Sequence, residues 1–292
     1  MLFKHSKPAM FLFVLPLLLI YGIIVIFQLA QGFLMSFAKW DGVNAATFIG
    51  LQNYQKLFAS PDLWPSIRNS ILFSIFLTIY QIGLATFFAY ILVNVDIWMK
   101  KFFKAAFFVP VLLSATVVAQ LFVSIYHGDY GLINKLSEAL GSNWCQNWLA
   151  EPIKGILAIA FGESWKGMGY HMLIIYAAMR NVPKTYYEAA RIDGAGAARQ
   201  FFALTFPLTS QAIKVCFIMC ITFGFRAFEM IFIMTGGGPG NYTSTMSIMM
   251  YKAMFSLRNY GLSNAIAMMI VFICVVIMFG IEKATTSTNT DM

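Results

Sequence analysis

Residues 186–208 read YYEAARIDGAGAARQFFALTFPL and lie between two long apolar runs. Pro183, just before this segment, suits the first turn of a helix, where its missing N–H costs nothing. Residues 184–191 are mostly good helix formers, and Asp193-Gly194 is typical of a turn. A second short helix is expected from about Gly196 to Leu204, until a proline starts the next apolar run. The segment is therefore predicted to form two short helices joined by a turn.

The surface of this segment is expected to be low and smooth, because small side chains dominate it. Small residues let another helix approach closely, and a few charges at fixed positions can orient a partner. Such a segment suits insertion into a cleft on another protein. The competing interpretation is an amphipathic connector at the membrane surface, and the residues alone favour neither. The small residues are Ala189, Ala190, Gly194, Ala195, Gly196, Ala197 and Ala198, and the charged residues are Glu188, Arg191, Asp193 and Arg199.

The composition of the whole chain is that of an integral membrane protein. Of its 292 residues, 60% are hydrophobic and 11% are charged, and its mean hydropathy is +0.73, whereas a soluble domain is about a quarter charged. Six apolar runs approach the ~20 residues that cross a bilayer as a helix. They lack the period-2 alternation of barrel strands, so an all-α fold with six transmembrane helices is predicted. The runs lie near residues 10–35, 70–93, 105–126, 155–178, 208–233 and 262–281.

The domain organisation follows from these runs. The first run follows a basic start but is too long for a signal peptide, so it is expected to remain as a first span, kinked at Pro16. Residues 1–69 would hold this span and an ordered outer loop. Residues 70–281 would form a core of five spans that includes the loop 183–207, and residues 282–292 a flexible tail.

The net charge of +8 is explained by topology and does not indicate nucleic-acid binding. If six spans alternate, ten basic residues fall on one side and seven on the other, where they are spread over longer loops. The positive-inside rule then places both termini and the loop 183–207 in the cytoplasm. The ten are Lys4, Lys7, Lys100, Lys101, Lys104, Arg180, Lys184, Arg191, Arg199 and Lys283. The seven are Lys39, Lys56, Arg68, Lys135, Lys154, Lys252 and Arg258.

The outer loops between the spans carry local structure signals. The segment from Gly131 to Leu140 is expected to form a short helix at the outer interface. In the third outer loop, glycines permit backbone angles closed to other residues, and Pro239 is expected to end the fifth span. The loops are therefore interpreted as ordered elements and not as linkers.

Several motifs together identify a resemblance to a known family. Glu188-Ala189-Ala190, then Asp193-Gly194-Ala195, then an aromatic stretch ending at Pro207 resemble the cytoplasmic EAA loop of permease subunits of binding-protein-dependent ABC importers. MTGGGPG (234–240) resembles the outer end of span five in the carbohydrate branch of that family. SFAKWDG (36–42), FIGLQNY (48–54) and LWPSIRNSILFS (63–74) resemble its first outer loop and second span, so the resemblance covers nearly the whole chain. One departure is Ala198, near which the family often has a tryptophan.

The resemblance implies a type I ABC importer (MetI-like) permease fold, similar to the first permease of maltose, glycerol-phosphate and multiple-sugar systems. The loop would dock into a groove on a cytoplasmic ATPase, with Glu188 reaching a basic group and Gly194 permitting the turn. The implied partners are a second related permease, two ATPase subunits, an extracytoplasmic solute-binding protein, a carbohydrate and the lipid bilayer of a bacterial cytoplasmic membrane. The implied ATPase-coupling residues are Tyr187, Glu188, Ala189, Ala190, Asp193, Gly194, Ala195 and Pro207.

The sequence agrees with a subunit that is not itself an enzyme. It contains no G-x-x-x-x-G-K-[ST] loop, and its glycine-rich segment lacks the lysine that meets phosphates. No cofactor is expected to bind directly, and ATP would be used by the partner subunits. Cys216 and Cys220 have no His or carboxylate near them in sequence, so buried thiols are favoured over a metal site.

Ionisable residues within spans usually face a cavity or a partner, because each costs roughly 2.5–3.5 kcal/mol to insert. Glu163, Lys166 and His171 fall in span four, and Arg226 and Glu229 in span five. Arg226 and Glu229 are three apart, so they are expected to share a helical face and to pair.

The family places its substrate path along spans four to six, where aromatic faces stack on sugar rings. The candidates for lining it are Trp165, Tyr170, Phe223, Arg226, Glu229 and Asn264. The alternative is that Arg226–Glu229 and Lys166–Glu163 are ion pairs that only hold helices together.

Two other function classes remain in competition. An ion-coupled secondary transporter would use buried carboxylates, but Glu163 and Glu229 are the only acids in the spans, and each has a basic residue three positions away. Such a transporter would also have no use for the loop 183–207. A membrane enzyme would need an acid cluster, a metal motif or a nucleophile motif, and the sequence has none of these.

Overall fold

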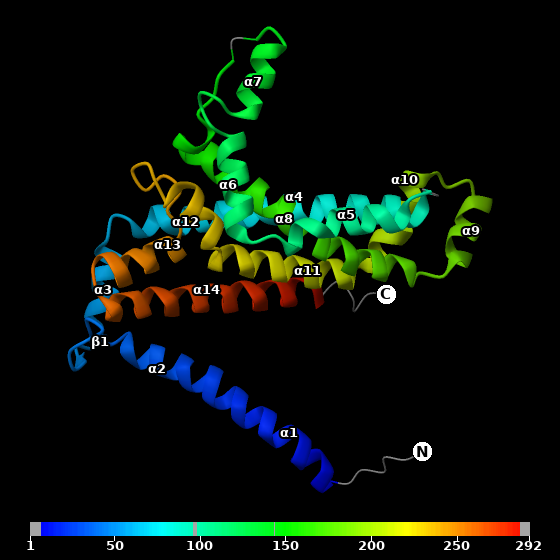
Figure 1. Ribbon diagram of the computed structural model, residues 1–292. Coiled ribbons are helices and arrows are strands. Elements are labelled where there is room, and N and C mark those ends of the chain that lie inside the picture. The colour runs from blue at the N-terminus through cyan, green and yellow to red at the C-terminus, as the bar shows by residue number, and fades with distance from the viewer. Residues whose placement is uncertain (1–6, 96–97, 143, 287–292) are drawn as a thin grey trace. The chain divides into compact units, whose positions relative to one another are not determined.

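Helix dominates the computed structural model, which describes residues 7–95, 98–142 and 144–286 (Figure 1). Helix accounts for 78% of it and strand for 1%, which confirms the predicted all-α class. Contacts divide the chain into two units, Met1–Pro61 with Met249–Phe272, and Asp62–Ile248 with Ile273–Met292. The predicted domain boundaries at 69 and 281 stay a prediction. The predicted tail begins within the last helix, and its residues 287–292 lie outside the described residues.

The first unit contains an apolar helix and a small substructure of short strands and helices. None of the residues of the helical stretch Val14–Met35 is buried, and the helix passes through Pro16 without a break. The two short strands pair antiparallel, with Ala38 opposite Phe48. The elements are α1 (Lys7–Tyr21), the π-helical segment Gly22–Phe27, α2 (Gln28–Met35), β1 (Ala38–Lys39), β2 (Thr47–Phe48), α3 (Gln52–Ala59), the end of α13 (Met246–Tyr251), the π-helical segment Lys252–Ser256 and the first half of α14 (Tyr260–Thr286).

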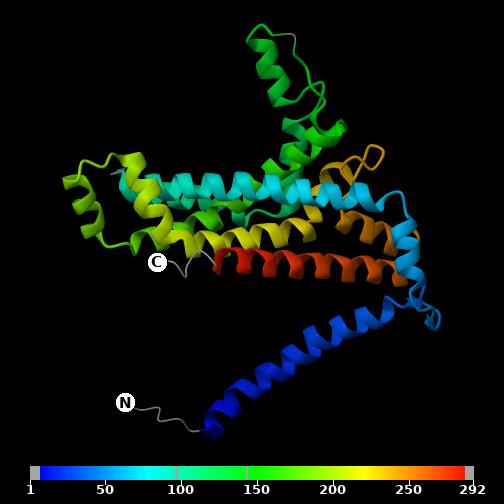
Figure 2. The same ribbon diagram turned by 180° about the vertical axis from the view of Figure 1, so that it is seen from behind.

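The second unit is a helical bundle in which α4, α5, α8 and α11 run side by side, as Figures 1 and 2 both show. The short helix expected near Gly131–Leu140 is present as α7. The elements are α4 (Leu63–Asn94), α5 (Lys100–Leu112), α6 (Ala115–Ile125), α7 (Leu132–Ala139), the 3₁₀ turn Trp148–Ala150, α8 (Pro152–Arg180), α9 (Lys184–Ile192), α10 (Ala197–Gln200), the π-helical segment Phe201–Thr205, α11 (Phe206–Arg226), α12 (Glu229–Thr235), the start of α13 and the end of α14.

Small residues let α4 and α11 approach closely. Ser70, Ser74 and Thr78 repeat every four residues along α4, and each hydroxyl donates to the carbonyl one turn earlier. Each hydroxyl therefore donates its hydrogen bond within α4. The small side chains leave space for the neighbouring helix to approach. Gly224 of α11 packs there so tightly that a Cβ at this position would lie 2.4 Å from Ser74 Oγ. Close packing of small residues is a main source of helix association in a membrane.

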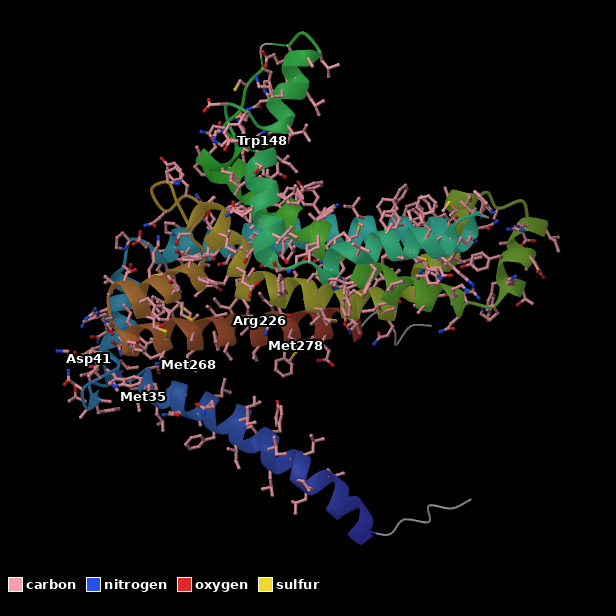
Figure 3. The ribbon with its side chains drawn as sticks, viewed as in Figure 1. Met35, Asp41, Trp148, Arg226, Met268 and Met278 are labelled. Carbon is pink, nitrogen blue, oxygen red and sulfur yellow. The ribbon has the colours of Figure 1, made fainter. Side chains whose placement is uncertain are left out.

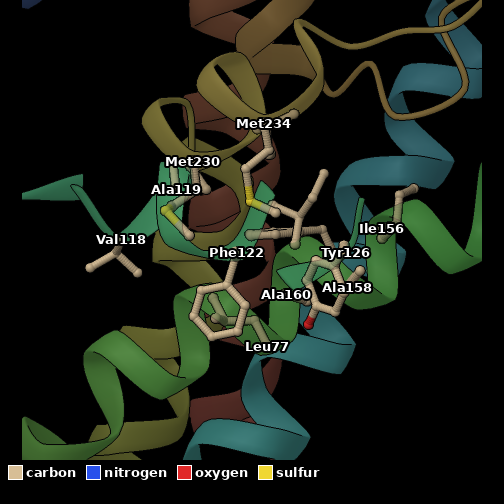
Figure 4. Packing of buried hydrophobic residues seen from close by; sticks show 14 of the residues in the cluster. Leu77, Val118, Ala119, Phe122, Tyr126, Ile156, Ala158, Ala160, Met230 and Met234 are labelled. Carbon is tan, nitrogen blue, oxygen red and sulfur yellow. The ribbon is translucent and has the colours of Figure 1, made fainter. Parts of the chain in front are cut away.

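The core of the bundle consists of two clusters of buried side chains. One cluster joins α4, α6, α8 and α12, with Leu77, Phe122, Ile156 and Met230 among its members (Figure 4). The other cluster lies further along α4, α8 and α11 and includes Met172. The two clusters fix the mutual positions of α4, α8 and α11, which line the cavity described below.

Four described helical stretches are long and apolar enough to span a membrane, and the bent pair formed by α5 and α6 is either a fifth, broken span or a re-entrant loop. The four are Val14–Met35, Leu63–Asn94, Ala197–Arg226 and Tyr260–Lys283. The predicted fourth span corresponds to α8, which has 29 residues but is less apolar because of its glycines and charged residues. The chain is therefore a multi-pass membrane protein.

Two predicted spans differ from the observed helices. The run 105–126 is not straight, because α5 and α6 meet at 98°. Leu113 is extended there and the Ser114 hydroxyl accepts from Val117 N, which caps a new helix. The run 208–233 breaks after Arg226, so Pro239 is not what ends it. The carbonyl of Phe225, whose helical partner would be Glu229 N–H, accepts instead from the Ser247 hydroxyl.

Candidate functional site

The loop 183–207 forms the two helices predicted from its sequence, α9 and α10. Pro183 is the residue before α9 and not within its first turn. α9 ends in a Schellman motif, because Gly194 N–H donates to Arg191 O and Ala195 N–H donates to Ala190 O. Gly194 has φ +72°, a conformation that residues with a Cβ rarely adopt. The predicted turn at Asp193-Gly194 is therefore confirmed, with a specific need for glycine.

The second helix of the loop is not separate from the span that follows it. α10 continues through the π-helical segment Phe201–Thr205 into α11, so the helical stretch Ala197–Arg226 is unbroken. Pro207 lies at the start of α11 as expected, but it does not interrupt the helix that precedes it. The π-helical turns upstream accommodate its missing N–H and its ring.

Three side-chain hydrogen bonds order the loop, two of them within it and one from α4 of the bundle. The Tyr187 hydroxyl lies 3.0 Å from Thr205 Oγ1, and the Tyr90 hydroxyl of α4 donates to Ala197 O. Gln200 Nε2 donates to Ala195 O across the turn, at 2.7 Å. The loop thus has a defined orientation on the ends of α4 and α11.

The rest of the loop surface is open. No residue of α9 or α10 is buried, and the Ile192 side chain is 88% exposed. Glu188 is exposed and makes no ion pair with the described residues. Of the other predicted residues, Ala189, Asp193 and Pro207 are exposed, whereas Ala190 and Ala195 are half-buried. The loop therefore offers an ordered, partly apolar surface with an unpaired carboxylate.

A cavity of about 300 Å³ lies between α4, α8 and α11, and its mostly apolar lining includes several polar and ionisable side chains. Three of the predicted pathway residues, Tyr170, Phe223 and Arg226, line it together. The last of these, labelled in Figure 3, is the final residue of α11. The remaining lining residues are Gln81, Glu163, Gly167, His171, Met219, Cys220 and Thr222.

Buried polar groups connect the walls of this cavity. Cys220 Sγ lies 3.2 Å from Gln81 Oε1 and 3.5 Å from His171 Nε2. Gly167 makes room for Gln81, because a Cβ there would lie 1.8 Å from Gln81 Nε2. Glu163 is 8% exposed and makes no hydrogen bond or ion pair with a described residue. A buried carboxylate facing a cavity without a partner is costly unless a ligand satisfies it.

The other predicted pathway residues lie elsewhere. Trp165 packs into the bundle core, with its ring 5.8 Å from that of Phe122. Asn264 belongs to the first unit, where its amide donates to Tyr260 O. The expectation that Arg226 and Glu229 share a helical face is wrong, because the chain breaks between them and Glu229 begins α12. The structure shows no ion pair between these two residues, nor between Lys166 and Glu163.

Sequence reasoning missed part of the cavity. It singled out Glu163 and His171 only as ionisable residues in a span, and it gave no role to Gln81. The available signal was Gln81, a polar residue within the apolar run 70–93. The glycine-containing run that faces it lies elsewhere in the sequence, and only the register of α4 on α8 brings the two runs together. Among the described residues, no group of three or more His, Cys, Asp or Glu side chains is arranged to hold a metal ion.

Comparison with known proteins gives consistent matches over most of the chain. Residues 81–282 match the family described as "Binding-protein-dependent transport system inner membrane component". The probable ABC transporter permease protein YurN of Bacillus subtilis is 32% identical over 92% of this chain and 93% of its own length. The multiple sugar-binding transport system permease protein MsmF of Streptococcus mutans is 30% identical, over 89% of each chain.

The fold also has a solved counterpart. A crystal structure of a bacterial alginate ABC transporter in complex with an alginate pentasaccharide-bound periplasmic protein contains a similar chain, with a TM-score of 0.80. The match covers 96% of this chain and 95% of the other, at 20% sequence identity. At this identity the likeness supports the fold alone.

Proposed function

Because the chain belongs to the family of binding-protein-dependent transport system inner membrane components, we propose that it is the transmembrane permease subunit of an ATP-driven importer of a sugar or related carbohydrate. One observation carries this proposal. The loop 183–207 is an ordered pair of helices with a glycine-dependent turn, few buried residues and an unpaired Glu188. An exposed but well-defined surface of this kind suits a partner protein better than it suits a simple connector.

The proposed partners bind on opposite sides of the membrane. The loop and both chain termini lie in the cytoplasm, which the excess of basic residues supports. Two ATPase subunits bind there, one at this loop and one at the matching loop of a second permease. A solute-binding protein delivers the solute at the opposite face. This chain supplies no catalytic residue and binds no cofactor, and the partner subunits use the ATP.

The loop transmits the motion of the ATPase to the spans. Glu188 pairs with a basic group of the ATPase, where a desolvated charge-assisted contact is strong. The Schellman motif at Gly194 holds α9 at a fixed angle to α10. Because α10 continues into α11 without a break, a displacement of the loop moves α11 as a unit. That movement opens or closes the cavity, whose lining includes Phe223 and Arg226 of the same helix.

The cavity between α4, α8 and α11 forms part of the solute path. Tyr170 and Phe223 offer aromatic faces to a sugar ring, and Arg226 and Glu163 offer a donor and an acceptor to its hydroxyl groups. The relative named for multiple sugar binding supports the carbohydrate class. Glu163 then gains the hydrogen bonds that no described residue provides.

Transport in proteoliposomes tests the proposal. The chain is reconstituted with the permease, ATPase and binding protein encoded beside it, and uptake of labelled sugars is measured with ATP enclosed in the vesicles. Uptake should require both ATP and the binding protein. Uptake that continues without ATP and follows a proton or sodium gradient would contradict the proposal and favour an ion-coupled secondary transporter.

A further inference from the structure

A second pocket, of about 470 Å³ and with a more polar lining, lies entirely within the first unit. Three basic residues from segments far apart in the sequence line it: Lys39 of β1, Lys56 of α3 and Arg258, two residues before α14. Trp40 and Leu257 add apolar surface beside them. The pocket is distinct from the cavity between α4, α8 and α11 and shares no residue with it.

The basic residues of this pocket have no partner within the described chain. Lys39, Lys56 and Arg258 are exposed and make no ion pair or side-chain hydrogen bond with a described residue. Asp41, labelled in Figure 3, is the acid among the lining residues. Its carboxylate accepts from Val43 N at 3.0 Å and Asn44 N at 2.8 Å.

The Asp41 carboxylate is therefore used within its own turn. The hydrogen bonds from Asn44 and Val43 lower the pKa of Asp41 to about 2, so it carries one negative charge at neutral pH. Three positive charges against one leave the pocket with an excess of two. An excess of positive charge in a concave site attracts an anion.

The walls of the pocket are held in place by other bonds. The buried Asn53 side chain donates to Ser36 O and Ala38 O, at 2.9 and 2.8 Å. Trp40 O accepts from Tyr260 N, and the Trp40 and Tyr260 rings lie 5.3 Å apart. The backbone that presents Lys39 and Arg258 is therefore fixed before any ligand arrives, which lowers the entropy cost of binding.

The position of the basic residues argues against chance. The predicted outer loops carry seven basic residues, in a part of a membrane protein where Lys and Arg are normally scarce. Three of the seven converge on this pocket. Arg258 also has φ +48°, a conformation uncommon for a residue with a side chain.

We propose that this pocket binds a phosphate group, with Lys39, Lys56 and Arg258 donating to its oxygens and Trp40 and Leu257 contacting the adjoining part of the ligand. Phosphate offers several acceptor oxygens, which suits a cluster of ammonium and guanidinium donors. The phosphate belongs either to an anionic lipid or to a soluble phosphorylated compound. Lys39 follows the apolar stretch Val14–Met35 closely, and Arg258 precedes α14. Basic and aromatic residues at the ends of spans meet the lipid headgroups.

Lipid retention tests the first source. The purified chain is held in nanodiscs of phosphatidylcholine with a minor fraction of phosphatidylglycerol, and the lipid that remains bound after release into detergent is counted by native mass spectrometry. The test variant carries Lys39→Gln, Lys56→Gln and Arg258→Gln. Retained phosphatidylglycerol should fall about a hundredfold, because each cation near an anionic headgroup contributes roughly a factor of five.

Two further variants show whether a loss of lipid is caused by the missing charge at this pocket, by loss of charge elsewhere or by misfolding. The control carries Arg68→Gln, Lys135→Gln and Lys154→Gln, which removes the same charge from the same predicted side and should keep the lipid. The variant Lys39→Arg, Lys56→Arg and Arg258→Lys preserves the charges and should also keep it, which excludes misfolding as the cause of a loss.

Soluble phosphates test the second source. Inorganic phosphate and glycerol 3-phosphate are titrated calorimetrically into the chain in phospholipid-free detergent. Binding that the Gln variant abolishes and the control keeps would assign the pocket to a soluble phosphate. Retention of phosphatidylglycerol without such binding would assign it to lipid. The proposal is overturned if neither probe distinguishes the Gln variant from the control. It does not depend on the transport function, so the two succeed or fail separately.

Discussion

Two connecting segments of the second unit, residues 183–205 and residues 235–248, use glycine and small residues in opposite ways. The segment 235–248 packs into its own chain: Thr243, Ser244, Thr245, Met246, Ser247 and Ile248 are all buried. The Asn69 amide of α4 donates to Tyr242 O and Ser244 O, and Ser70 Oγ accepts from Met246 N. The segment 183–205 keeps α9 and α10 free of buried residues.

One glycine from each segment shows this difference in packing. Gly237 and Gly194 both adopt positive φ, +88° and +72°. A Cβ on Gly237 would lie 2.9 Å from Ile248 Cγ2, whereas nothing lies within 4 Å of the same position on Gly194. The segment 235–248 is therefore packed against residues of its own chain. The segment 183–205 has an ordered backbone but leaves most of its surface exposed, which is what a docking element requires.

The largest effect is expected where the packed segment is held by α4. Asn69→Leu removes the hydrogen bonds to the part-buried carbonyl of Tyr242 and the buried carbonyl of Ser244, which should cost roughly 2–4 kcal/mol of unfolding free energy. The measurement is SDS titration of the detergent-solubilised chain. Asn94→Leu is the control, because Asn94 is exposed at the end of the same helix and donates only to Tyr90 O. If Asn69→Leu and Asn94→Leu lowered the unfolding free energy equally, the proposed difference in packing between the two segments would be contradicted.

A smaller effect is expected from paired alanine substitutions at the two glycines. Gly237→Ala should lower the unfolding free energy by about 2–3 kcal/mol, because the backbone penalty adds to contact with Ile248. Gly194→Ala should cost only the backbone penalty, about 1 kcal/mol. The same titration gives both values. A larger cost at Gly194 would mean that its surroundings are more closely packed than the structure shows.

The smallest effect on stability is expected on the open surface of the loop. Ile192→Ser should change the unfolding free energy by less than about 0.5 kcal/mol, because this side chain is exposed. It should nevertheless weaken capture of the proposed ATPase partner, measured by co-purification, since it removes apolar contact area. Leu140→Ser, at a similarly exposed position after α7, is the control and should change neither. Loss of stability in Ile192→Ser would show that the loop surface packs on its own chain.

The sequence was sufficient for the elements that depend on local chemistry. Apolar runs predicted the helical class, and Pro183 with Asp193-Gly194 predicted α9, the turn and α10. Hydropathy reports how apolar a run is, but it does not report direction, so the 98° bend after α5 and the break after Arg226 were missed. Both depend on a hydroxyl, that of Ser114 in one case and Ser247 in the other. The Ser247 contact is visible only in the folded chain.

The cavity, too, could be predicted only in part from the sequence. Tyr170, Phe223 and Arg226 were predicted because aromatic and charged residues in spans stand out in a sequence. Gln81 and His171 join them through the register of α4 on α8, which Gly167 permits. Trp165 carries the same sequence signal as Tyr170 but lies in the core, because a five-residue separation places the two on different parts of the helix surface.

The most direct test of the account is whether Glu188 attaches the chain to an ATPase. The chain is co-expressed with the proposed partner permease and ATPase and extracted in mild detergent. The co-purified ATPase is then quantified for the unmodified chain, Glu188→Lys and Glu138→Lys. Glu138 is an exposed acid of α7 in the predicted outer loop and serves as the matched charge reversal. If Glu188 forms this attachment, Glu188→Lys should lower bound ATPase by about tenfold or more, while Glu138→Lys should leave it unchanged. ATPase binding that ignores the Glu188 change, or that falls equally in both variants, would contradict the account.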